Sequence, residues 1–193
     1  MTASILRKAG YRTGLYISPY IVTFRERIQL DGEMIPPEEL AWAVEQVQAA
    51  AEQMRAEGTP PVEFEAVPAT ALLWYAKAKA DVVVLEVGLG GRLDSTNIIP
   101  APEIAVITNI GLEHTQELGN TLAAIAGEKS GIIKPGCHTV LYHQTREVEA
   151  VVGEACRRAG SPLTLTDPDS LKVLSSGREG QRFIYRSKGP FRI

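Results

Sequence analysis

Three apolar, strand-like runs of this chain end in polar side chains whose types suit a bound cation. These side chains are Ser18, Glu86, Asn109, Glu113 and His114. If the runs are parallel strands, their carboxyl ends share one edge of a sheet, which is where ligands of such sheets bind. A hydroxyl, a carboxylate and an imidazole together suit a divalent cation, and oxygen-rich ligation favours magnesium or manganese.

A glycine-rich loop follows Glu86 at once. The run before it, Val82 to Leu85, predicts a strand buried on both faces. The loop begins as Gly-x-Gly, but position 93 is Leu and no helix pattern follows, so the dinucleotide-binding fingerprint is excluded. The chain also contains no Gly-Lys dipeptide, and so no Walker A sequence. We therefore interpret the glycines as positions where the backbone approaches a ligand closely.

Each candidate also has a simpler structural interpretation. Ser18 with Pro19 could form only a turn, and Glu86 could be a solvated strand end. His114 alone would be a surface or structural histidine. Lys129 could lie on a solvated helix face, whereas if it is turned inward its amine could meet phosphate or react with carbon dioxide to give a carbamate. Only the repeated placement at strand ends favours the functional interpretation.

The elements that would position these residues alternate between strands and helices up to Gly160. This alternation predicts an α/β fold, a mostly parallel sheet with crossover helices. From residue 163 on, weak alternation and turn signals predict short antiparallel strands. We expect one domain over 1–193, with a parallel core over 1–160 and a β appendage over 161–193. Helices are expected over 2–9, 36–57, 64–79, 121–133 and 146–159, and strands over 12–17, 25–30, 82–85, 104–108 and 139–142.

Composition excludes several classes of function. The chain has 193 residues, 45% of them hydrophobic, and a formal net charge of −3, so nothing indicates nucleic-acid binding. No apolar run reaches the ~20 residues needed to cross a bilayer, which argues against a membrane protein. Residues 1–8 lack a signal-peptide layout, and Cys137 and Cys156 have neither metal-site spacing nor a disulfide framework. These observations favour a reducing cytoplasm.

Several segments taken together resemble the folylpolyglutamate synthase and dihydrofolate synthase family, a branch of the Mur ligases. Their order and spacing agree with the family from the first residues to about Pro135. Tyr20 stands where many members have histidine, so the chain departs from the family at that position. The matching segments are residues 18–20, 24–28, 85–97, 108–114 and 125–134.

The resemblance implies a Mur ligase central domain and an ATP-dependent ligase that adds L-glutamate to folate, or also to dihydropteroate, through an acyl phosphate. By motif, Ser18 and Glu86 would bind one Mg²⁺ at the ATP phosphates, and His114 would bind a second. Lys129 would be a carbamylated lysine that bridges toward the second ion and takes part in catalysis with His114. The parent enzyme would be a monomer. The remaining cofactor-binding positions implied are Gly88, Gly90, Gly91, Arg92, Asp94, Asn97 and Asn109.

The resemblance also implies that much of the family's nucleotide site is missing. Members carry a Gly-Thr-Asn-Gly-Lys-Gly-Ser loop directly before the helix that here begins at residue 2, and they carry a C-terminal domain. We therefore expect an internal fragment that has no ligase activity by itself and that self-associates through a bared sheet edge. The alternatives are another Mur-type amino-acid ligase and a non-catalytic truncated binding module.

Overall fold

The computed structural model describes residues 1–186, and the chain divides into two compact units, Met1–Ile99 and Pro100–Ile193. Each unit has its own sheet and its own hydrophobic core. None of the helices within 1–186 combines the length and the apolar character needed to cross a bilayer.

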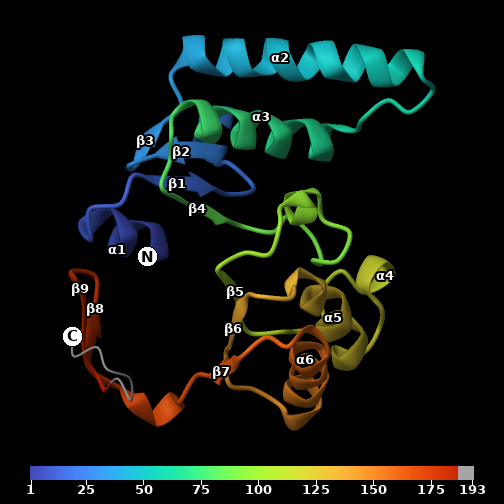
Figure 1. The fold of residues 1–193 in the computed structure, drawn as a ribbon. Helices are drawn as coiled ribbons and strands as arrows, with labels where there is room; N and C mark the ends of the chain where they lie inside the picture. Colours follow the sequence, from blue (N-terminus) through green and yellow to red (C-terminus); the bar gives the residue numbers. More distant parts are fainter. Residues whose placement is uncertain (187–193) are drawn as a thin grey trace. The chain divides into compact units, whose positions relative to one another are not determined.

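The first unit contains a four-stranded mixed sheet in the order β3-β2-β1-β4. Strands β1 and β4 are parallel, and β2 is antiparallel to both β1 and β3. Figure 1 shows the two long helices α2 and α3 of this unit side by side. Its elements are α1 (Thr2–Lys8), β1 (Thr13–Tyr16), η1 (Phe24–Arg27), β2 (Ile28–Leu30), β3 (Glu33–Met34), α2 (Pro37–Ala56), α3 (Glu63–Lys77), β4 (Val82–Leu85) and η2 (Ser95–Ile98).

Aromatic side chains of α3 pack against β1 in the core of the first unit. Trp74 and Tyr75 are buried there together with Tyr16. A Cβ at Gly14 would lie 3.0 Å from the Tyr75 ring, so a glycine is needed for the helix to approach the strand this closely. The Tyr75 hydroxyl donates a hydrogen bond to the Leu15 carbonyl at 2.6 Å, which satisfies its buried polar atom. Burial raises the pKa of Tyr75.

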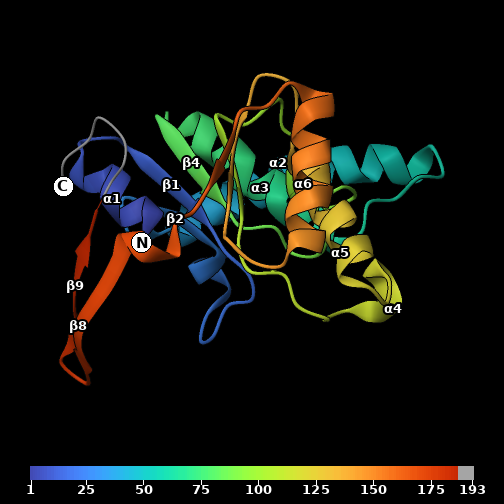
Figure 2. The ribbon, with the colours of Figure 1, turned by 90° about the horizontal axis from the view of Figure 1, so that it is seen from below.

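The second unit contains a three-stranded sheet, β5-β6-β7, in which every pair is parallel. Helices α5 and α6 lie side by side against it (Figure 2). Its core includes Ile107, Ile125 and Leu141, and α6 contributes Val148 and Val152, four residues apart on one helix face. Its elements are β5 (Ile104–Ile107), α4 (Thr115–Leu118), α5 (Leu122–Lys129), η3 (Ser130–Ile132), β6 (His138–Leu141), α6 (Arg146–Ala159), β7 (Leu163–Leu165), η4 (Pro168–Ser170), β8 (Leu171–Gly177) and β9 (Gly180–Tyr185).

The predicted fold class is confirmed, and so are the strongest helix predictions. Helix α6 has the bounds expected, and Gly160 ends it in the left-handed region with φ +63°. Helix α2 begins with a proline and two acids in its first turn, as its sequence indicates. The predicted boundary between a core over 1–160 and an appendage over 161–193 stays a prediction.

Three local predictions are wrong. The expected strand over 25–30 is strand only from Ile28, because η1 occupies the preceding residues. The apolar run over 104–108 predicts a buried strand, but one face of β5 is open, since Ile104 is 57% exposed and Val106 is 55% exposed. The last third is not antiparallel throughout, because β7 pairs parallel with β6, whereas β8 and β9 form the expected antiparallel hairpin. The apolar runs identified these strands, but their hydrogen-bonding partners depend on tertiary structure.

Two further predicted elements differ from expectation, one in its burial and one in its extent. Strand β4 is half-buried at all four of its positions rather than fully buried. The helix expected over 121–133 ends as α-helix at Lys129 and continues as the 3-10 turn η3. Part of the predicted tail, residues 187–193, lies outside the described residues.

Candidate functional site

The parallel pairing of β1 and β4 brings Ser18 and Glu86 together. Tyr16 lies opposite Leu85 in the register, so the residues that follow both strands meet at the carboxyl edge of the sheet. The Glu86 N–H donates to the Tyr16 carbonyl at 3.0 Å, and the Ser18 N–H donates to Glu86 Oε2 at 2.7 Å. Among the described residues, Glu86 Oε1 accepts no hydrogen bond, so this exposed carboxylate keeps one oxygen for another ligand.

Asp94 holds the glycine-rich loop in shape. Its Oδ2 accepts hydrogen bonds from the Gly88 and Leu89 N–H groups at 3.0 and 2.9 Å. Its Oδ1 accepts from the Thr96 N–H at 2.9 Å and from the Thr96 hydroxyl at 2.5 Å, and Asp94 is the N-cap of η2. Both carboxylate oxygens are therefore engaged by the loop itself. A Cβ at Gly88 would lie 3.2 Å from Asp94 Oδ2, so this glycine allows the close approach.

The other loop positions singled out from the sequence lie beside Asp94. Gly90 has φ +69°, a backbone conformation that favours glycine, and Gly90 and Gly91 are both buried. The Asn97 side-chain amide donates to the Arg92 carbonyl at 3.3 Å, while the Arg92 side chain is exposed. The loop therefore folds back on itself, and Arg92 is the one of these four residues that presents an exposed charge.

Glu26 fixes the segment after Ser18, and the sequence reasoning missed it. Its carboxylate accepts hydrogen bonds from the N–H groups of Ile21, Val22 and Thr23 at 2.7 to 2.9 Å. These backbone hydrogen bonds hold the pKa of Glu26 below its usual value. The signal was present, since Thr23 and Glu26 form a capping box, a pattern that can be found in sequence.

A cationic and aromatic cluster adjoins this segment and was also missed. The Arg27 guanidinium lies 5.3 Å from the centroid of the Tyr20 ring and 5.9 Å from that of Phe24. Burial raises the pKa of Tyr16, although the positive charge of the nearby Arg27 acts in the opposite direction. Among residues 1–186, the buried Arg27 Nε has no hydrogen-bond partner. The cluster packs around Tyr20, the position at which the chain departs from the resembled family.

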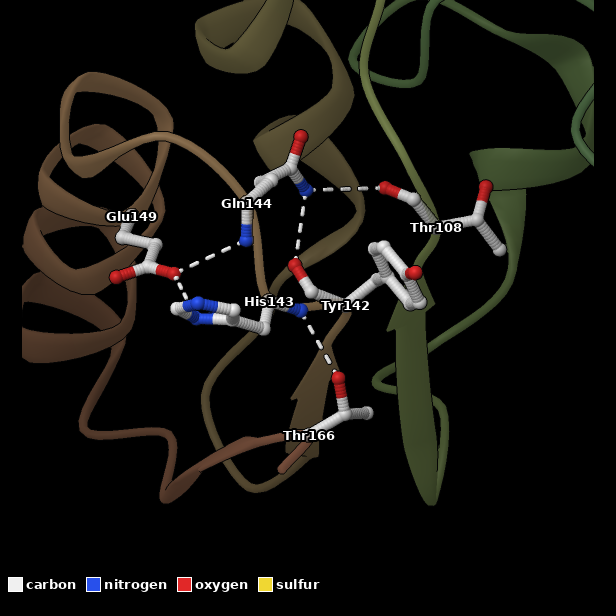
Figure 3. Close-up of polar contacts among 6 residues, drawn as sticks. All are labelled: Thr108, Tyr142, His143, Gln144, Glu149 and Thr166. Carbon is white, nitrogen blue, oxygen red and sulfur yellow. Dashed lines mark hydrogen bonds and ion pairs between the residues drawn. The ribbon is translucent and has the colours of Figure 1, made fainter. Parts of the chain in front are cut away.

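The second unit carries Asn109, His114 and Lys129. Asn109 is exposed in the turn after β5, between the buried Ile107 and Ile110. His114 is exposed and adopts left-handed backbone angles, φ 51° and ψ 42°, directly before α4. Lys129 is half-buried at the C-terminal end of α5. Figure 3 shows a hydrogen-bonded group at the carboxyl end of β6 that holds the turn containing Asn109.

The structure thus pairs Ser18 with Glu86 and places Gly88 to Asn97 in one loop, all within the first unit. The other four candidates, Asn109, Glu113, His114 and Lys129, lie in the second unit, where Glu113 is exposed next to His114. Within residues 1–186, no three His, Cys, Asp or Glu side chains gather into a metal site. Mg²⁺ usually binds one or two carboxylates and takes its other ligands from water and substrate phosphates, so the oxygen donors near Glu86 fit its chemistry without such a cluster.

Known proteins resemble this chain along nearly all of its length. A dihydrofolate synthase/folylpolyglutamate synthase of Bacillus subtilis is 44% identical over 188 residues, which are 96% of this chain and 44% of that protein. The solved folylpolyglutamate synthase of Thermotoga maritima matches 98% of this chain and 44% of its own with a TM-score of 0.87 and 37% identity. A solved FPGS–AMPPCP–folate complex matches 96% of this chain and 46% of its own, with a TM-score of 0.88 and 38% identity.

No protein-family model matches the chain. The predicted resemblance to the folylpolyglutamate synthase and dihydrofolate synthase family is nevertheless confirmed, because sequence and structure both match along 96% of the chain. The chain spans a little under half the length of these relatives.

Proposed function

We propose that this chain is part of an ATP-dependent ligase that adds L-glutamate to a folate. The observation that carries the proposal is the 44% identity over 188 residues to a dihydrofolate synthase/folylpolyglutamate synthase. The likeness to a solved FPGS–AMPPCP–folate complex, at 38% identity, supports ATP and a folate as substrates. The position of Glu86 and the glycine loop at the carboxyl edge of parallel strands is where such a fold binds ligands.

In the proposed reaction, the γ-phosphate of ATP passes to the carboxylate of the folate, which releases ADP. The amine of glutamate then attacks the acyl phosphate, forms the amide and releases inorganic phosphate. Bound Mg²⁺ would neutralise charge on the transferring phosphoryl group. We propose that Ser18 and Glu86 hold one ion, that His114 holds a second, and that Lys129 is carbamylated to give an additional carboxylate.

The contacts within the first unit support different roles for Glu86, Asp94 and the loop glycines. The Ser18 N–H fixes the orientation of Glu86 while leaving Oε1 available. Asp94 keeps the backbone around Gly88 folded next to that carboxylate, and Gly90 and Gly91 let the loop pass close to a ligand. We propose that Arg92, with its exposed charge, faces the phosphates.

The test is an assay of the complete gene product that contains these residues. It would be incubated with ATP, radiolabelled L-glutamate and either tetrahydrofolate, dihydropteroate or a uridine-diphosphate muramyl peptide. We expect labelled folate products and equimolar ADP. Labelling of dihydropteroate as well would show that the protein also has dihydrofolate synthase activity. Labelling of the muramyl substrate alone, or of none of the three, would refute the proposal.

A matched pair of variants tests the proposed role of Glu86 in the same assay. Glu86→Gln removes the charge with little change of shape, and we expect it to lower kcat by about 100-fold, the scale at which groups that stabilise transferred charge act. Glu33→Gln makes the same change at an exposed carboxylate of β3 and should leave kcat unaltered. Equal effects of the two variants would contradict the role of Glu86.

A further inference from the structure

The side-chain amide of Gln144 bonds to the backbone on both sides of Asn109. Its Oε1 accepts a hydrogen bond from the Ile110 N–H at 2.9 Å. Its Nε2 donates to the Thr108 carbonyl at 3.3 Å, as Figure 3 shows. The same Nε2 donates to the Tyr142 carbonyl at 3.0 Å. One amide therefore links the turn after β5 to the segment after β6, across 34 residues of sequence.

Gln144 is itself held in place by the first turn of α6. Its N–H donates to Glu149 Oε1 at 3.1 Å, and the same oxygen lies 2.7 Å from His143 Nδ1. The His143 N–H donates to the Thr166 hydroxyl at 2.9 Å, which ties the segment to the end of β7. The backbone that carries the Gln144 amide is thus bonded to a helix and to a neighbouring strand.

The consequence concerns Asn109. Ile107 and Ile110 are anchored in the core, while Thr108 and Asn109 project from the carboxyl edge of the sheet as exposed residues. The Gln144 hydrogen bonds fix the peptide groups directly before and after Asn109, so they fix the direction in which its side chain leaves the backbone. A water molecule could satisfy either backbone group singly, but it could not couple the two to β6 and α6.

We propose that Gln144 is a positioning residue that orients Asn109 for contact with bound Mg²⁺-nucleotide. The inference rests on the proposed function and extends it, because Gln144 acts through Asn109 and does not itself touch the ligand. Residues that orient ligand-binding groups in this way change affinity or activity by about 10- to 100-fold when they are lost.

The test measures the affinity of the complete gene product for AMPPCP in the presence of Mg²⁺, by calorimetry. Gln144→Met keeps the length of the side chain and removes its hydrogen bonds, and we expect it to weaken AMPPCP binding by about 10-fold or more. Gln181→Met makes the same change on the β8–β9 hairpin, where the amide donates to the Ser176 hydroxyl, and should bind as the wild type does. Amide hydrogen exchange at Ile110 should accelerate in Gln144→Met alone.

A double-mutant cycle separates positioning from general damage. In an Asn109→Ala background, Gln144→Met should cause no further loss of AMPPCP affinity. A full additional 10-fold loss in that background, or unchanged affinity in Gln144→Met, would overturn the inference. If Gln144→Met does not fold, Gln144→Glu keeps an acceptor for the Ile110 N–H and enters the same cycle. Failure of the wild type to bind AMPPCP would instead refute the proposed function and this inference with it.

Discussion

Asp94 is expected to control the order of the glycine-rich loop more than any other residue within it. Its two carboxylate oxygens accept four hydrogen bonds, two from the start of the loop and two from Thr96. Asp94→Asn leaves one oxygen and one amide group. Either both bonds from Gly88 and Leu89 are lost, or the bond from the Thr96 N–H is lost, because only the Thr96 hydroxyl can turn and accept from an amide. A hydrogen bond to a charged group contributes about 1.5 to 3 kcal/mol, and partial exposure lowers this. We estimate about 2 kcal/mol for this loss.

This loss is best measured by amide hydrogen exchange, because it concerns local opening and not global unfolding. About 2 kcal/mol corresponds to roughly 30-fold faster exchange, at Gly88 and Leu89 or at Thr96. Asp169→Asn is the control, since among the described residues the Asp169 carboxylate accepts no hydrogen bond. Unchanged exchange at all three amides of Asp94→Asn, relative to this control, would show that the carboxylate does not hold the loop.

Three further predictions concern stability and titration. His114 has φ 51°, a left-handed conformation that glycine adopts more easily than alanine. In thermal unfolding, His114→Gly should therefore be more stable than His114→Ala by about 1 kcal/mol, and an equally or more stable Ala variant would contradict this. In an NMR titration, the Glu26 carboxyl should have a pKa below its ordinary value. The stability that its hydrogen bonds contribute should be present above pH ~4.5 and lost as the pH falls through that lowered pKa. A titration midpoint at or above the ordinary value would contradict this prediction. Leu141→Ala empties a fully buried position and should cost about 2 to 5 kcal/mol in urea unfolding, whereas Leu171→Ala at an exposed one should cost under about 0.5; equal costs would show that the core is misassigned.

The sequence was sufficient to predict that Ser18 and Glu86 meet. Each follows an apolar run, and if the two runs are parallel neighbours, residues that follow them share an edge. The long helices were also predictable, because caps, prolines and apolar spacing agree along α2 and α6. These predictions succeeded because several local sequence signals agree with one another.

The burial of the strands and the contacts of the loops were harder to predict from the sequence. Nothing in the residues of β5 distinguishes a strand with one exposed face from one buried on both, because the distinction depends on what packs against each face. The hydrogen bonds of Gln144 join segments that are far apart in the sequence. No periodic or local sequence pattern predicts such bonds. Glu26 differs from Gln144 in this respect, since its bonds are local and the capping box could have revealed them.

Two carboxylates of the glycine-rich loop region show why residue type alone does not separate a ligand from a scaffold. Asp94 and Glu86 are acids at the two ends of the same loop, and both were candidates for the same site. In the structure, Asp94 uses both oxygens on the loop, whereas Glu86 accepts one hydrogen bond, from Ser18, and is exposed. A cation needs a lone pair that the protein has not already engaged, so Glu86 is the one suited to bind it. Asp94 instead keeps the Gly88 backbone in place.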